Sequence, residues 1–232
     1  MSLRYLLVAA VICATPAFAG SLFFDFGDPG QNTGSNYNNM NHNGTYPNPP
    51  APIANAIDST GAATGISLAV NDIFWPGTNF NGTQAPIGDA AQFDVQATRD
   101  NFFGSTVAFG GFTEPTGGFT LAGLNPGNTY TFTFFASRTG VSDVREAYYA
   151  VSGQSSETVL LNASNNVSEV AVTMALQPLP DGTMTIQVGP GPNNTNASGF
   201  YYIGSMRIDE VPEPASALLI ALGAVAAFAR RR

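Results

Sequence analysis

The sequence predicts an all-β fold, a single β-sandwich or jelly roll, and three observations support this. Apolar and polar residues alternate in about ten short segments between residues 20 and 210. Turns rich in Gly, Pro and Asn separate these segments, and the chain holds 25 Gly and 16 Pro in 232 residues. No window between the two terminal segments carries a long helical period. Many short alternating strands at regular spacing are typical of sandwiches and barrels.

The clearest strand is predicted over 129–138. Tyr130, Phe132 and Phe134 share one face of it, and threonines take the other. The turn before this strand has Pro126 and Gly127 at the central positions expected of a type II turn. Further strands are predicted over 147–151, 158–161, 170–176, 184–188 and 201–208, whereas residues 31–56 and 71–88 are expected to form irregular loops.

Residues 1–19 have the pattern of a signal peptide, which would form a helix before the sandwich domain of residues 20–210. Arg4 is followed by an apolar run, and Ala17 and Ala19 frame a small-residue cleavage site. Cleavage after Ala19 would remove Cys13, the only cysteine. The mature protein would then have no disulfide and no thiol nucleophile, and its stability would depend on its core.

Residues 211–232 form a second processing segment with three blocks. Pro212, Glu213 and Pro214 are extended and accessible, since proline cannot enter a regular helix interior. The apolar run 215–229 predicts a hydrophobic, transmembrane-like helix of about 22 Å, slightly short of the roughly 30 Å hydrocarbon core. Arg230, Arg231 and Arg232 would keep its end cytoplasmic. The alternative is an ordinary tail anchor whose prolines merely begin the helix.

This order of blocks closely resembles the PEP-CTERM sorting signal of Gram-negative bacteria. The resemblance covers about a tenth of the chain. It implies recognition by an exosortase, after a transient stay of the helix in the inner membrane. It also implies delivery to the cell surface or to an extracellular polysaccharide matrix such as that of a biofilm. It implies nothing about the chemistry of the domain that is sorted.

Charge and composition exclude several classes of partner and cofactor. The eight basic residues are all arginines, and without Arg4 and residues 230–232 four remain; the sixteen acids without Glu213 leave fifteen. The mature domain therefore carries about −11 and is not expected to bind nucleic acid or anionic lipid. A single histidine and no mature cysteine exclude the usual zinc sites. No cofactor is expected, although a structural Ca²⁺ on a loop is an alternative, with oxygen ligands drawn from Asp25, Asp28, Asp72, Asp89, Asp94 and Asp100.

No catalytic residues are predicted. The segment Phe26–Gly34 resembles the first block of GDSL-type esterases, but Pro29 occupies the position of the nucleophile. His42 is the only histidine and lies in an Asn-rich loop, where it is poorly placed to act as a base. Two convergent carboxylates for glycoside hydrolysis are not indicated by any spacing.

Among the remaining functions, sugar binding has the strongest physical support in the sequence. Trp75 lies beside Pro76 and Gly77 in a predicted loop, and sugar rings stack on flat aromatic side chains. The alternative, and the commoner role, is a tryptophan that caps one end of the core. Within each pair Tyr148–Tyr149 and Tyr201–Tyr202 one ring must face away from the core, which makes Tyr148 and Tyr202 further candidates; packing of these rings under a loop is the alternative. Arg138, at the end of an apolar face, is expected to pair with an acid such as Asp25.

The strand and turn segments GLNPGNTYTFTFFASR, YYAVSG, DGTMTIQV and FYYIGSMRI diffusely resemble the galactose-binding-like and carbohydrate-module sandwiches of secreted bacterial proteins. Fibronectin-type sandwiches share much of this pattern. The sequence therefore predicts an exported, non-enzymatic surface or matrix protein with a structural or polysaccharide-associated role. A carbohydrate-binding module with a defined sugar site is the alternative, and an unrecognised enzyme is the third.

Overall fold

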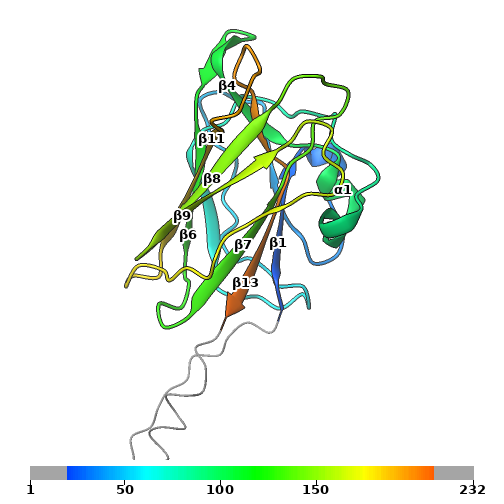
Figure 1. Ribbon diagram of the computed structural model, residues 1–232. Coiled ribbons are helices and arrows are strands. Elements are labelled where there is room, and N and C mark those ends of the chain that lie inside the picture. Colours follow the sequence, from blue (N-terminus) through cyan, green and yellow to red (C-terminus); the bar gives the residue numbers. More distant parts are fainter. Residues whose placement is uncertain (1–19, 212–232) are drawn as a thin grey trace, which may run out of the picture.

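The computed structural model describes residues 20–211, which form two five-stranded sheets packed as a sandwich (Figure 1). The first sheet has the spatial order β10 (Ala171–Val172), β7 (Thr129–Phe135), β13 (Ser205–Val211), β1 (Leu22–Gly27) and β2 (Asn38–Asn41). The second has the order β3 (Ser67–Asp72), β6 (Gly117–Ala122), β11 (Met184–Pro190), β8 (Glu146–Ser152) and β9 (Ser156–Asn162). The predicted all-β sandwich is confirmed.

A smaller sheet stands at one end of the sandwich, uppermost in Figure 1. It contains β12 (Tyr201–Ile203), β4 (Phe102–Phe109) and β5 (Phe112–Glu114). The helical elements of the described residues are short: η1 (Pro29–Gln31), η2 (Gly88–Gln92) and α1 (Val95–Thr98). Within residues 20–211, no helix has the length and hydropathy to cross a membrane. The predicted signal peptide, with Ala17 and Ala19, and the tail from Pro212 to Arg232 lie outside the described residues.

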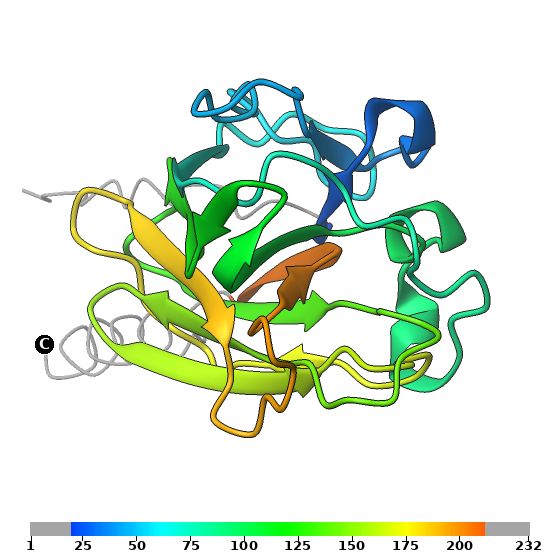
Figure 2. The ribbon, with the colours of Figure 1, turned by 90° about the horizontal axis from the view of Figure 1, so that it is seen from above.

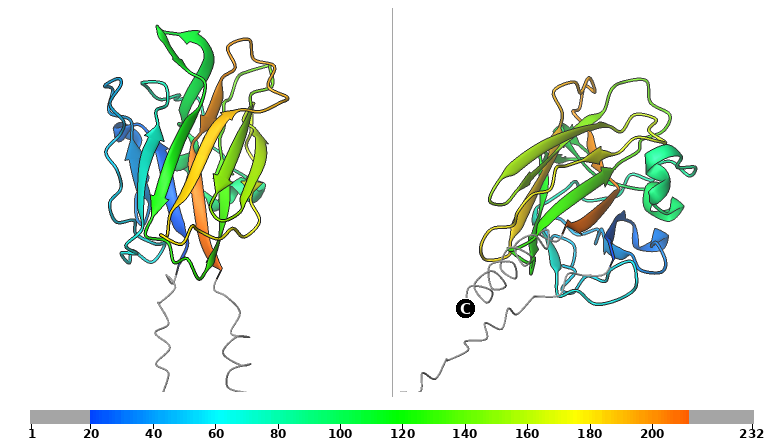
Figure 3. Two further views of the ribbon diagram at one scale, coloured as in Figure 1. Left: turned by 90° about the vertical axis from the view of Figure 1, so that its left-hand side faces the viewer. Right: turned by 60° about the horizontal axis from the view of Figure 1, so that its bottom comes forward.

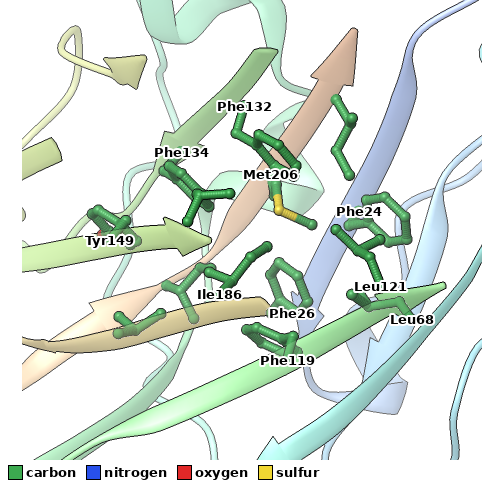
Figure 4. Packing of buried hydrophobic residues seen from close by; sticks show 14 of the residues in the cluster. Phe24, Phe26, Leu68, Phe119, Leu121, Phe132, Phe134, Tyr149, Ile186 and Met206 are labelled. Carbon is green, nitrogen blue, oxygen red and sulfur yellow. The ribbon is translucent and has the colours of Figure 1, made fainter. Parts of the chain in front are cut away.

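Alternation places one large side chain after another between the two sheets (Figure 4). Phe134 on β7 stacks on Tyr149 of β8, with ring centres 4.6 Å apart and planes 9° apart. Phe26 on β1 meets Phe119 on β6 at 4.7 Å. All four rings are fully buried. Burying an aromatic side chain of this size stabilises a fold by about 1.5–3 kcal/mol, so these contacts across the two sheets are the main source of stability.

One predicted strand ends early and another is divided, and Asn101 lies at both places. β7 stops at Phe135 because the Ser137 backbone bonds to a side chain instead of a neighbouring strand. The buried Asn101 amide donates to the Ser137 carbonyl at 2.8 Å and accepts from the Ser137 amide at 3.2 Å. The strand predicted over 201–208 divides at Gly204 into β12 and β13, which belong to different sheets. A Cβ on Gly204 would lie 2.7 Å from Asn101 Oδ1, so only glycine allows this close approach.

The Asn-rich segment 31–56 is not wholly irregular, contrary to the prediction. It contains β2, which pairs in parallel with β1. The Asn38 side chain accepts a bond from the Ile57 amide and donates to the Ile57 and Phe23 carbonyls. Polar side chains thus hold a strand that has little apolar alternation, and a hydrophobic pattern cannot reveal it. The turn Asn125–Asn128 forms as predicted, but Gly127 lacks the positive φ of a type II turn.

Both ends of the described chain lie at the end of the sandwich opposite the β4–β5 hairpin (Figures 1 and 3). Leu22, at the start of β1, pairs with Ile208, and Val211 at the end of β13 pairs with Thr129. The hairpin and the loop 191–200 occupy the other end. We call that end the hairpin end.

Two buried carboxyl groups lie side by side near the hairpin end of β1. Asp25 Oδ2 accepts bonds from the Thr33 amide and hydroxyl, and Asp100 Oδ2 accepts one from the Asp28 amide. The Oδ1 atom of each acid has no partner within residues 20–211. Burial, reinforced by the neighbouring acid, raises the pKa of Asp25 to about 7. Burial likewise raises the pKa of Asp100 to about 6, with repulsion from Asp28 adding to it.

These pKa values predict that the protein loses stability as the pH rises from about 4 to 7. The folded state binds protons on Asp25 and Asp100 that the unfolded state has already released near pH 4, so the free energy of unfolding falls across this window. Asp25→Asn keeps an acceptor for Thr33 and carries no charge. Thermal unfolding between pH 5 and 8 should therefore show a flatter pH dependence for this variant.

Asp181→Asn is the matched control. Asp181 is exposed, and its bonds with Thr183 lower its pKa, so its titration lies below the tested window. Its removal should leave the slope between pH 5 and 8 unchanged. Equal slopes for Asp25→Asn and the unmodified protein would contradict the assignment.

Candidate functional site

A groove of about 390 Å³ opens at the hairpin end of the molecule, the end that Figure 2 shows from above. It lies between the β4–β5 hairpin, the start of β12 and the loops that contain residues 75–81, 138–145 and 200. We call it the aromatic groove. Its lining residues are Trp75, Thr78, Asn79, Phe80, Asn81, Phe103, Phe109, Arg138, Arg145, Phe200 and Tyr202.

Three rings that stack one on the next line the aromatic groove. Trp75 stacks on Phe103 at 4.8 Å with planes 25° apart, and Phe103 stacks on Tyr202 at 6.1 Å with planes 29° apart. Phe109 meets Trp75 at 5.4 Å and Phe200 edge-on at 5.0 Å. Such offset and edge-on pairs are the favoured geometries of aromatic contacts. The rings therefore form one packed platform and are not independent surface side chains.

Trp75 is fixed by its own turn and by the hairpin. Its Nε1–H donates a 2.7 Å bond to the Phe109 carbonyl. A Cβ on Gly77 would collide with the Trp75 ring, and one on Gly110, where φ is +57°, would lie 3.0 Å from it. Trp75 is half-buried and also packs on the main core. It thus caps the core, as the alternative expectation held, and lines a groove as well.

Two arginines form the polar side of the groove. Arg145 Nε lies 3.1 Å from Asp143 Oδ1, its Nη1 donates to the Tyr202 hydroxyl at 2.5 Å, and its guanidinium lies 5.4 Å from the centre of the Phe200 ring. Arg138 donates to the Thr139 carbonyl. Burial raises the pKa of Tyr202, and the nearby positive charges of both arginines oppose that rise.

The predicted ion pair of Arg138 with Asp25 is wrong. Within residues 20–211 the two ion pairs are Arg145–Asp143 and Arg207–Asp209. Asp25 is instead held by Thr33 and lies close to another acid. The Ser137 backbone bonds to the Asn101 side chain, and the next residue, Arg138, lines the groove.

Two polar atoms beside the groove are buried and unpaired. Thr78 Oγ1 and Asn79 Nδ2 have no partner within the described part of the chain, and neither atom is open to the groove. The Asn79 backbone is nevertheless fixed, because it exchanges two bonds with Asn101 at 2.9 and 3.0 Å. An unpaired buried polar group costs about 1–3 kcal/mol, so these two atoms lower the stability of the segment that lines the groove.

Of the three sugar-contact candidates, Trp75 and Tyr202 lie together in the groove and Tyr148 does not. Tyr148 is half-buried on the outer side of β8, where it covers Gly189. Both rings of the pair Tyr201–Tyr202 are buried, because Phe103 and Phe200 pack against the Tyr202 ring. Sequence reasoning missed Phe80, Phe103, Phe109, Phe200 and Arg145, because nothing in a local pattern shows that these loops converge.

The other candidate chemistry has a structural explanation. In the segment that resembles an esterase block, Asp28 caps the turn η1 by accepting the Gly30 amide at 2.8 Å. His42 Nδ1 accepts the Gly44 amide, and burial lowers the pKa of this histidine. Among residues 20–211, no three His, Cys, Asp or Glu side chains gather as a metal site would require.

Residues 210–232 match the PEP-CTERM protein-sorting motif. The chain thus carries the signal that the sequence predicts, which marks it for export and for exosortase-mediated sorting to the cell surface. No curated protein matches the chain.

Several solved structures overlap parts of the domain loosely. TmCBM61, solved in complex with β-1,4-galactotriose, is 15% identical. The match covers 48% of this chain and 70% of the TmCBM61 chain, with a TM-score of 0.28. The ANXUR2 extracellular domain from Arabidopsis thaliana is 12% identical. The match covers 83% of this chain and 42% of that domain's chain, with a TM-score of 0.40. CBM35 from Cellvibrio japonicus Abf62 is 14% identical. The match covers 63% of this chain and 98% of that chain, with a TM-score of 0.29. These scores are too low for the ligands of those proteins to bear on this chain.

The packing of Trp75 predicts that Trp75→Phe destabilises the domain. The variant removes the bond to the Phe109 carbonyl, and the loss should reach at least about 1 kcal/mol in the free energy of unfolding. Urea unfolding followed by circular dichroism measures it without relying on tryptophan fluorescence. Tyr148→Phe, also half-buried but outside the groove, should cost less, and equal losses in the two variants would contradict this role of Trp75.

Proposed function

We propose that this chain is a non-enzymatic, exosortase-sorted protein that binds extracellular polysaccharide in the aromatic groove. One observation carries the proposal. A platform of stacked rings lies in the same groove as the polar side chains of Asn79, Asn81, Arg138 and Arg145. The apolar face of a sugar ring stacks on aromatic side chains, while its hydroxyls bond to amides and hydroxyls. The groove therefore supports a defined sugar site more strongly than a purely structural association.

The position of the groove suits a protein attached through its C-terminus. Val211, the last described residue before the sorting tail, lies at the opposite end of the sandwich (Figures 1 and 3). A domain that is first held in the inner membrane by the apolar segment 215–229 and then transferred by exosortase would point its groove away from the point of attachment. The groove would then face the matrix.

The lining of the groove supports binding over hydrolysis. It contains no Asp or Glu side chain. Hydrolysis of a glycosidic bond requires two carboxyl groups on either side of the bond. Asp143 is the acid that reaches the groove through Arg145, and it is held by Arg145 and Asn196. These two partners lower its pKa, whereas a general acid needs a raised one.

The exposed rings test the proposal. Phe80 and Phe109 are 54% and 45% exposed, so the sandwich should still fold when alanine replaces either ring, although Phe109→Ala also removes packing on Trp75 and Phe200. Each ring should contribute about 0.5–1.5 kcal/mol of stacking, which corresponds to roughly 2- to 12-fold weaker binding. The measurement is affinity electrophoresis in gels that contain polysaccharide extracted from the producing cells.

Leu160→Ala is the matched control, since Leu160 is 43% exposed on β9 and lies outside the groove. It should bind like the unmodified protein. Saturable binding that persists without both Phe80 and Phe109 would show that the sugar site lies outside the aromatic groove. Absence of binding by the unmodified protein would leave the structural role, and turnover of the polysaccharide would indicate an enzyme.

The sorting route has its own test. A chain that lacks residues 212–232 should be exported but should no longer be retained at the cell surface, whereas the intact chain should be found there with a shortened C-terminus. Mass spectrometry of the surface form should also place its N-terminus at Gly20. An uncut tail in the surface protein, or normal surface delivery without residues 212–232, would contradict exosortase processing.

A further inference from the structure

The positive charge of an acidic domain is concentrated in the aromatic groove. Residues 20–211 contain four arginines and fifteen acids, and two of the four arginines line this one groove. Arg207 lies outside the groove and is bound to Asp209 at 2.7 Å, and Arg99 bonds to Gln96. No acid lines the groove beside Arg138 and Arg145.

Of the two arginines that line the groove, Arg138 is the one without an ion pair among residues 20–211. Arg145 is neutralised by Asp143, which keeps it in place against Tyr202 and Phe200. Neither ion pair of the described residues includes Arg138, although its side chain is half-buried. A partly buried guanidinium without an acid is costly unless an anion meets it. Its planar group of donors matches a carboxylate or a sulfate.

The charged groups of the groove also favour an anion. The guanidinium groups of Arg138 and Arg145 contain only hydrogen-bond donors. A ligand that bonds to them must bring acceptor oxygens. A sugar that carries a carboxylate or a sulfate brings more of them than a neutral sugar does.

We propose that the aromatic groove is specific for acidic polysaccharide, with the sugar ring on the Trp75 platform and its anionic group on Arg138. This inference rests on the proposed function of the groove. The net negative charge of the domain does not prevent such binding, since charges beyond about 8 Å are screened at physiological ionic strength. Specificity then depends on the groups within the groove, where Arg138 selects the anion and Arg145 positions the rings.

The test compares one polysaccharide before and after its charge is removed. Matrix polysaccharide from the producing cells is divided into an untreated sample, a carboxyl-reduced sample and a desulfated sample. The mature surface protein should bind the untreated sample at least about tenfold more tightly than one of the treated samples, which corresponds to about 1.4 kcal/mol. Loss on carboxyl reduction identifies a uronic acid, and loss on desulfation identifies a sulfated sugar.

Arg138→Gln should bring the affinity for the untreated sample down to that for the neutralised one, without weakening binding of the neutralised sample. Arg99→Gln is the control and should keep the preference for charge. Equal binding of all three samples by the unmodified protein, or a preference that survives in Arg138→Gln, would overturn the inference and leave sugar binding intact. Binding to no sample would overturn both this inference and the proposed function.

Discussion

The aromatic groove depends on the side chain of Asn101, which is fully buried at the junction of three segments. Its amide group bonds both backbone atoms of Ser137, its own backbone pairs with Asn79, and it lies against Gly204. Each contact positions part of the site, since Arg138 follows Ser137, Asn79 lines the groove and Tyr202 precedes Gly204. One buried polar residue thus brings together loops that are far apart in the sequence. A buried amide with all its partners also fixes a single arrangement, because any other would leave it unpaired.

The fold was largely predictable from the sequence, because a sandwich depends on alternation and alternation is a local property. Tyr130, Phe132 and Phe134 lie in the core as their spacing predicts. The exceptions are places where a side chain replaces a backbone partner. β2 is held by Asn38, and β7 is shortened by Asn101, so neither boundary has a hydrophobic signal.

The site was predictable only in part. Trp75 could be found because a tryptophan beside Pro and Gly in a polar loop is conspicuous, and Tyr202 because it has a tyrosine neighbour. Arg138 was expected to pair with an acid, but the acid content of a sequence does not show which acids a strand brings near. Tyr148 obeys the same strand rule as Tyr202 yet lies on another surface. The convergence of the loops is a tertiary property. The sorting tail, in contrast, is a linear signal and was recognised directly.

The abundance of asparagine explains how a chain without a disulfide can hold such loops. Asn194 donates to the carbonyls of Glu146 and Phe200, and Asn196 bonds Asp143, so the loop that carries Phe200 is tied to the one that carries Arg145. Each such bond contributes only about 0.5–1.5 kcal/mol, but together they fix the loops before any ligand arrives. A groove that is already ordered loses little conformational entropy on binding, and each side chain that need not be immobilised saves about 0.5–1.5 kcal/mol. The asparagines that make the loops look irregular in the sequence are therefore what holds the groove in one arrangement.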